Sequence, residues 1–277
     1  MLHLDKQQEN IFLANNIDLG ITHIFGGQVL AQAIYASYNT LEKDRYMHSL
    51  HSYFLLPGQL EKPIIYDVEN LRDGSSFSAK RIKAIQDDRP IFHMTASYQK
   101  EQNGLIYQEN LSEVPTPDVL PGKQELAKQL KDVYPDTFIQ KFILNNPIDI
   151  KFVTVPNLQK ENQNNNYRYV WMKLNDPIAN QEISTHQALL AFASDLHFLS
   201  TALQVHGLSY ASNNLRLATI DHAIWFHEKF DFNQWILYAI KNTKNINSRG
   251  FVLGQFYDKD KKLLASTSQE GLLRVKN

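Results

Sequence analysis

The feature of this sequence that most restricts its fold is an internal repeat, in which the second half of the chain follows the element order of the first. Three landmarks recur at a nearly constant spacing: His51 and His222 lie 171 residues apart, and Tyr66 and Tyr238, like Ser76 and Ser248, lie 172 apart. Chance matching of common strand residues is the alternative, since the identities are sparse. The shared order of elements favours a tandem duplication of one small unit.

Apolar periodicity predicts a helix followed by four strands in each half. In the first half, a helix begins at Gly26 and continues through Tyr35, and strands follow over 47–55, 64–72, 76–86 and 90–99. In the second half, strands near 148–155 and 167–174 precede a longer helix at about 183–204, and strands follow over 214–229, 234–243, 247–257 and 262–274. One helix beside an antiparallel sheet buries only one face of each, so two α+β units gain stability by joining their sheets.

The middle of the chain is predicted to be a linker. Five of the ten prolines fall between Ser112 and Asp149, where the apolar periodicity is weakest. We therefore expect a first unit over 1–103, a linker with a short helix over 104–147, and a second unit over 148–277.

Composition excludes several classes of protein. The formal net charge of −1 disfavours a nucleic-acid partner or an anionic membrane surface. The absence of cysteine rules out a thiolate nucleophile, a disulfide framework and a cysteine-based metal site. No run approaches the roughly 20 apolar residues of a membrane span, and the N-terminus lacks the features of a signal peptide, so we expect a cytoplasmic protein.

The common catalytic motifs are also missing from the sequence. It contains no Gly-x-Ser-x-Gly elbow, no P-loop, no Gly-x-Gly-x-x-Gly fingerprint and no His-Glu-x-x-His helix. Strand alternation places His48 and His51 on opposite faces, and likewise His222 and His227, so these pairs are not expected to bind a metal.

Asp195 is the most informative single residue. On a helix, its neighbours three and four positions away are Ala191, Phe192, Phe198 and Leu199, which are all apolar. An unpaired buried carboxylate is costly, so Asp195 must be hydrogen-bonded or have a shifted pKa. It is either a structural partner of the facing sheet or part of a functional site.

Two further polar residues are candidates. Gln269 shares one strand face with Leu263, Ala265 and Thr267, so its carboxamide is expected to face the core, for structure or to hold a water. Thr219 is weaker, because strict alternation puts it opposite the more apolar face that carries His222.

Longer segments reveal a family resemblance. In order along nearly the whole chain, the sequence resembles acyl-CoA thioesterase II in Ile24-Phe-Gly-Gly-Gln-Val29, His48-Ser-Leu-His-Ser-Tyr-Phe-Leu55, Tyr66-Asp-Val-Glu-Asn-Leu-Arg-Asp-Gly-Ser-Ser-Phe-Ser78, Pro90-Ile-Phe-His-Met-Thr-Ala-Ser97, Ala193-Ser-Asp-Leu196, Ala218-Thr-Ile-Asp-His-Ala-Ile-Trp-Phe-His227, Ser248-Arg-Gly-Phe-Val252 and Ala265-Ser-Thr-Ser-Gln-Glu-Gly271. The connecting segment 101–165 matches this family poorly.

This resemblance implies a double hotdog, in which two tandem hotdog units form a continuous antiparallel sheet around central helices. It implies hydrolysis of fatty acyl-CoA, with Asp195, Thr219 and Gln269 as the catalytic residues that activate a water, and with no cofactor or metal. An activated thioester needs only a positioned water, so no strong nucleophile is required. The alternatives are a non-catalytic acyl-CoA-binding module and a hotdog enoyl-CoA hydratase, for which Asp221 and His222 are the only adjacent Asp/His pair.

The repeat also predicts a single catalytic centre, in the second unit. The repeat offsets map Asp195, Thr219 and Gln269 onto Ile24, His48 and Ser97, so no carboxylate is present in the first unit. His48 is the one residue of the first unit that could provide a second catalytic centre, because a histidine can act as a base unaided. A dimer or tetramer is expected, because hotdog sheets present edge strands.

Overall fold

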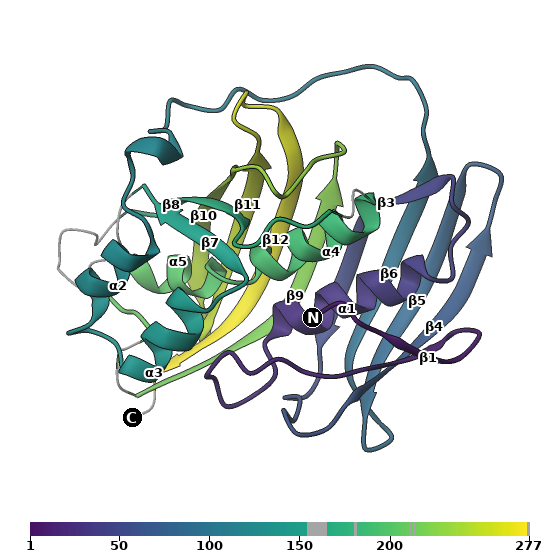
Figure 1. Cartoon of the computed structure of the whole chain (residues 1–277), viewed down its shortest axis with the longest axis horizontal. Helices are drawn as coiled ribbons and strands as arrows, with labels where there is room; N and C mark the ends of the chain where they lie inside the picture. Colours follow the sequence, from purple (N-terminus) through teal and green to yellow (C-terminus); the bar gives the residue numbers. More distant parts are fainter. Residues whose placement is uncertain (154–164, 180–181, 211, 213, 276–277) are drawn as a thin grey trace.

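The computed structural model describes residues 1–153, 165–179, 182–210, 212 and 214–275. Its strands form one antiparallel sheet of 12 strands in the order β1-β2-β4-β5-β6-β3-β9-β12-β11-β10-β8-β7 (Figure 1). The first half supplies β1 (Asp5–Gln8), β2 (Ile11–Ala14), α1 (Gly26–Tyr38), β3 (Arg45–Phe54), β4 (Ile64–Asp73), β5 (Phe77–Gln86) and β6 (Arg89–Lys100). The second half supplies β7 (Ile148–Phe152), β8 (Tyr167–Leu174), α4 (Ile183–Ser194), α5 (Phe198–Gln204), β9 (Leu215–Phe226), β10 (Ile236–Ile246), β11 (Arg249–Tyr257) and β12 (Leu263–Val275).

The two halves join through β3 and β9, and this junction confirms the duplication. Its register pairs His51 with Ala223 and Ser52 with His222. His51 and His222 are repeat partners 171 residues apart, and Ser52 and Ala223 have the same spacing. A pseudo-twofold axis therefore passes between these two pairs, as expected for a double hotdog.

The repeat is longer than the sequence pattern predicts. A hairpin of β1 and β2 lies beside β4, just as β7 and β8 lie beside β10. The first hairpin escapes detection because Asp5–Gln8 is exposed along its whole length and carries no apolar alternation. Each unit is thus a hairpin, a helical segment and four strands.

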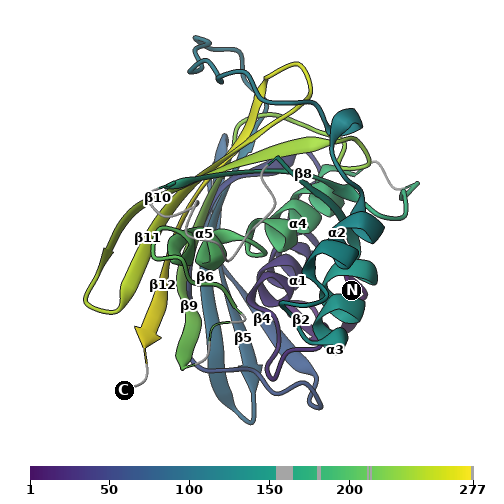
Figure 2. The ribbon, with the colours of Figure 1, turned by 90° about the vertical axis from the view of Figure 1, so that its left-hand side faces the viewer.

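The helices α1 and α4 contact each other within the curve of the sheet (Figure 2). Both are buried along most of their length, including Leu30 and Ile34 of α1 and Leu190 and Phe192 of α4. Because neither helix has an exposed face, each is stable only when covered by the other helix and by the sheet.

The single helix predicted over 183–204 is wrong, because α4 ends at Ser194 and α5 begins at Phe198. A side chain from outside the helix takes its last carbonyl: the Tyr238 hydroxyl donates to Ser194 O at 3.2 Å. Leu196 N instead donates to Ala193 O, which tightens the turn. Tertiary contacts therefore stop the helix at Asp195.

The region between the units crosses the outer face of the second unit before it becomes helical. Trp171 Nε1 donates to Pro115 O at 2.8 Å, and Leu111 and Val114 pack on the outer cluster of Trp171, Leu237 and Tyr257. The short helix expected in this region is α2 (Lys123–Leu130), flanked by a 3-10 turn η1 (Pro117–Val119), α3 (Asp136–Phe138) and a π-helical turn η2 (Ile139–Leu144). Within the described ranges, no helix has the length and apolarity needed to cross a bilayer.

Candidate active site

Asp195 directly follows Ser194, the last residue of α4, and its carboxylate faces the beginning of α1. Its side chain is buried, with the residue 4% exposed, and it accepts a hydrogen bond from the Gly27 backbone N–H. A Cβ on Gly26 would lie 2.8 Å from Asp195 Oδ2, and one on Gly27 would lie 2.5 Å from Phe192 O. The two glycines therefore let the first turn of α1, which carries partial positive charge, approach the carboxylate.

The structure brings all three sequence-predicted site residues together. Gln269 Nε2 donates to Asp195 Oδ1 at 3.0 Å, and Thr219 Oγ1 donates to the same oxygen at 3.3 Å. Gln269 is 1% exposed and lies on the inner face of β12, as the strand pattern predicts. One carboxylate oxygen thus collects two side-chain donors from neighbouring strands.

The predicted orientation of Thr219 is wrong, and a β-bulge explains why. The register of β12 and β9 shifts at Ile220: Glu270 pairs with Asp221, whereas the next residue, Gly271, pairs with Thr219. The extra residue reverses the alternation, so Thr219 joins His222 on the inner face while Ala218 turns outward.

Two residues that the sequence reading did not select complete the cluster. His222 is fully buried, and its Nδ1 lies 2.7 Å from Gln269 Nε2. Its Nε2 lies 3.1 Å from Ser194 Oγ, next to the end of α4. The spacing of 171 residues between His51 and His222 marks His222 as a repeat position, but it does not predict this contact.

Burial raises the pKa of Asp195 to about 7, although hydrogen bonds from Gly27, Gln269 and Thr219 act in the opposite direction. Desolvation penalises the charged carboxylate more than these donors stabilise it. Burial lowers the pKa of His222 to about 3, so its imidazole is neutral at physiological pH. The cluster therefore holds one group that titrates near neutrality, which suits a general base.

Gln269 Oε1 has no hydrogen-bond partner among the described residues, although it is buried. Such an orphaned acceptor is costly unless a water or substrate group fills the position. Gln269 therefore presents this acceptor beside the Asp195 carboxylate, to which its own amide nitrogen is hydrogen-bonded.

His48 lies outside this cluster. The β3–β6 register shifts between Met47 and Ser49, and this bulge turns His48 toward the outer face, where its Nε2 contacts Ser97 Oγ at 2.8 Å. His51 is also on the outer face, against the Trp225 ring, so the prediction that His48 and His51 face opposite ways is wrong. In the described part of the chain, no group of three or more His, Asp or Glu side chains is arranged to hold a metal.

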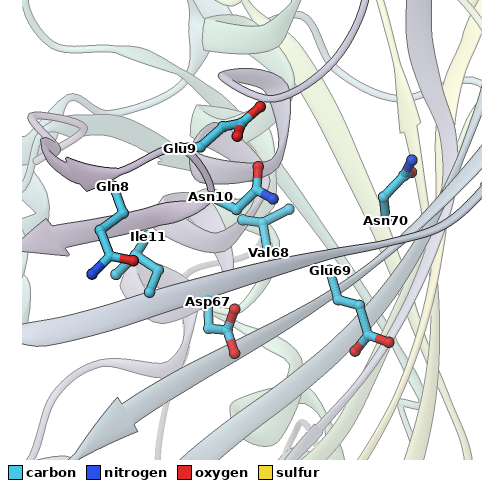
Figure 3. Close-up of a pocket in the computed structure, with 8 residues that line it drawn as sticks. All are labelled: Gln8, Glu9, Asn10, Ile11, Asp67, Val68, Glu69 and Asn70. Carbon is cyan, nitrogen blue, oxygen red and sulfur yellow. The ribbon is translucent and has the colours of Figure 1, made fainter.

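A separate cleft of about 480 Å³ lies between the β1–β2 turn and β4 (Figure 3). It is lined by Gln8, Glu9, Asn10, Ile11, Asp67, Val68, Glu69 and Asn70, and none of these belongs to the Asp195 cluster. In the sheet, β5, β6 and β3 separate β4 from β9. Asp67 and Glu69 are paired with Lys83 and Arg81, so this cleft lacks an uncompensated acidic pair.

Solved structures share this architecture. An acyl-CoA thioesterase II from Mycobacterium marinum has a TM-score of 0.81 and 29% identity, covering 100% of this chain and 97% of that one. A hot dog fold protein of unknown function from Alicyclobacillus acidocaldarius has a TM-score of 0.80 at 16% identity, covering 100% and 97%. The chain is therefore a double hotdog protein.

Sequence comparison gives the family. The acyl-CoA thioesterase family model matches residues 139–272, and the model for the acyl-CoA thioesterase N-terminal domain matches 16–99. Acyl-CoA thioesterase 2 of Haemophilus influenzae is 38% identical over 274 residues, which are 99% of this chain and 96% of that protein. Human acyl-coenzyme A thioesterase 8 is 31% identical over 283 residues, 100% of this chain and 88% of that protein. The chain belongs to the acyl-CoA thioesterase II family.

Proposed function

We propose that this protein hydrolyses fatty acyl-CoA to free fatty acid and CoA, using a water held by Asp195, Thr219 and Gln269. Family membership supports the hydrolase activity and the acyl-CoA substrate. The observation that carries the choice of residues is the convergence of Gln269 Nε2 and Thr219 Oγ1 on Asp195 Oδ1 inside a buried site.

In this proposal, Asp195 is the general base. The water oxygen forms a bond to the thioester carbonyl carbon while its proton passes to the Asp195 carboxylate, and the carbonyl becomes an oxyanion. The tetrahedral intermediate then breaks its C–S bond, and the CoA sulfur leaves as a thiolate that takes up the proton. The products are a carboxylic acid and CoA, and Asp195 is again a carboxylate.

Thr219 and Gln269 set the geometry of this step. Both donate to Oδ1 of Asp195, which stabilises the carboxylate and holds it in one orientation. Gln269 offers its free carbonyl oxygen to the water. Fixing the water between two acceptors keeps an oxygen lone pair available to the substrate, which is the advantage of a positioned nucleophile.

The geometry does not support hydration of enoyl-CoA. Asp221 and His222 are neighbours on β9 with diverging side chains: Asp221 Oδ1 accepts from Glu270 N, whereas His222 contacts Gln269 and Ser194 in the core. An acid–base pair at one substrate carbon is not formed by these two residues.

The decisive experiment measures CoA release from a chain-length series of acyl-CoA thioesters, with Asp195→Asn as the inactive control. Enoyl-CoA hydration and acyl-CoA binding without turnover are measured in parallel. Thiol release by the wild type well above that of Asp195→Asn supports the proposal. Binding without release, or hydration of enoyl-CoA in place of thioester cleavage, would replace it with one of the alternatives.

The proposal extends to assembly and location. A homo-dimer or tetramer in the cytoplasm is proposed, on the grounds that β1 and β7 leave two sheet edges unpaired within the described chain and that the chain has no cysteine. Light scattering that gives the mass of one chain, or fractionation that finds the protein outside the cytoplasm, would refute these two points.

A further inference from the structure

We infer that His222 is a positioning residue, whose neutral imidazole holds the Gln269 carboxamide with its nitrogen toward Asp195 and its oxygen toward the reacting water. This inference rests on the proposed function, since it assigns a role at the same site. Among the described residues, His222 forms no hydrogen bond with the Asp195 carboxylate, and it acts through Gln269.

The direction of each hydrogen bond follows from the end of α4. Ser194 Oγ donates to Ala191 O at 2.8 Å, and in this arrangement it accepts a hydrogen bond from His222 Nε2, at 3.1 Å. His222 therefore carries its proton on Nε2. A neutral ring with a proton on Nε2 has a bare Nδ1, which is an acceptor.

This bare Nδ1 determines which end of the Gln269 amide faces the histidine. Only the NH₂ group can donate to Nδ1, at 2.7 Å, and its second hydrogen reaches Asp195 Oδ1 at 3.0 Å. The opposite amide orientation would point Oε1 at two acceptors, the bare nitrogen and the carboxylate. The hydrogen-bonding chain from Ser194 through His222 thus selects one orientation of the Gln269 amide.

The consequence lies at the other end of the amide. With both hydrogens of Nε2 engaged, Oε1 is left as a buried acceptor with no partner in the described residues. A water beside Asp195 can donate one hydrogen to Oε1 and the other to the carboxylate. His222 therefore contributes to the reaction by keeping an acceptor, and not a donor, on the water side of Gln269.

The tautomer of His222 provides a test that does not depend on activity. In protein labelled with ¹⁵N-histidine, the His222 signals, assigned by their loss in His222→Asn, are expected to show a protonated Nε2 and an unprotonated Nδ1 at pH 7.5. A protonated Nδ1 would overturn the inference. This result stands whether or not the proposed hydrolysis is found, so a failure of one is distinguishable from a failure of the other.

Paired substitutions test the link to catalysis. His222→Asn keeps an acceptor near the position of Nδ1, whereas His222→Gln keeps a polar group near Nε2 but removes that acceptor. We expect His222→Gln to lower kcat by about 10-fold or more with little change in KM, and His222→Asn to retain more activity. Equal losses in the two variants would contradict the inference.

A double-mutant cycle separates positioning from general packing. In a Gln269→Leu background there is no amide to orient, so His222→Gln should lower kcat by no more than about 3-fold further. Full additivity of the two losses would show that His222 acts independently of Gln269. If His222→Gln fails to fold, the tautomer measurement on the wild-type protein still decides the question.

Discussion

Asp195 Oδ1 accepts a hydrogen bond from Gln269 Nε2 at 3.0 Å, across a sequence separation of 74 residues. The same carboxylate accepts the backbone N–H of Gly27, from the other unit of the duplication. The second unit thus supplies the side chains of the site, and the first unit supplies the helix start that faces them. Groups from both units of the duplication therefore meet at the Asp195 carboxylate.

Replacing the base tests the first prediction. Asp195→Asn keeps the shape of the side chain but cannot accept the proton, so turnover is expected to fall by about 100-fold or more while the fold is retained. Single-turnover rates and the circular dichroism spectrum provide the measurement. Near wild-type turnover in the folded variant would make Asp195 a structural residue.

The second prediction concerns the pH dependence of the reaction. Because burial raises the pKa of Asp195 to about 7, kcat/KM should rise with pH through that value as the carboxylate becomes charged. Burial and the charge of Asp195 also raise the pKa of Tyr238, so this phenol stays protonated in this range, and neutral His222 does not titrate.

Removing a hydrogen-bond donor to Asp195 tests the assignment of this pH profile. Thr219→Val removes a hydrogen bond that lowers the pKa of Asp195, so the acid limb of kcat/KM should move to higher pH. A shift to lower pH, or an acid limb near pH 4, would contradict the assignment of Asp195 as the titrating base.

The third prediction concerns stability. A carboxyl group whose pKa is raised on folding holds its proton more tightly in the folded state than in the unfolded one. The free energy of unfolding therefore falls as pH rises from about 4 to 7. Asp195→Asn removes this penalty and should be more stable than wild type at pH 8, by up to about 4 kcal/mol. The gain should shrink toward pH 4 in urea titrations.

Asp118→Asn on the exposed η1 turn is the control for this stability prediction. An equal gain in the free energy of unfolding of Asp195→Asn at pH 4 and pH 8 would contradict the explanation.

Gly27 provides the fourth prediction. A Cβ at this position would lie 2.5 Å from both Phe192 O and Phe25 Cε1, so Gly27→Ala must separate α1 from α4. We expect a loss of stability of about 1–3 kcal/mol and reduced turnover, because the helix start moves away from Asp195. Gly104→Ala is the matched control, since no atom lies within 4 Å of its added Cβ. Equal stability of the two variants would show that the helices tolerate this displacement.

The fifth prediction tests the number of catalytic centres. His48→Gln should retain most of the wild-type turnover, because His48 contacts Ser97 and Phe77 on the outer face and not the Asp195 cluster. Asp195→Asn is the comparison, measured at matched folding. A larger loss in the His48 variant would overturn the one-centre interpretation.

The helical segments of the two units do not align at the offset that the strands give. The hydroxyls of Tyr66 and Tyr238 donate to Val29 O and Ser194 O, so the helical segments align at an offset of 165. At this offset the position that matches Asp195 is Leu30, and not Ile24 as the offset of 171 predicts. The first unit still has no carboxylate there.

The duplication, most of the strands, the burial of Asp195 and the inward face of Gln269 all follow from the amino-acid sequence, because each depends on apolar spacing within one element. The end of α4 does not follow from the sequence, because it depends on a tertiary contact. The Tyr238 hydroxyl, from strand β10, donates to Ser194 O. The inward turn of Thr219 does not follow either. It requires a bulge opposite Glu270 and Gly271 on another strand, and one extra residue reverses every side chain beyond it. His222 joins Gln269 for the same reason: the contact depends on the register of β9 against β12, which local periodicity does not determine.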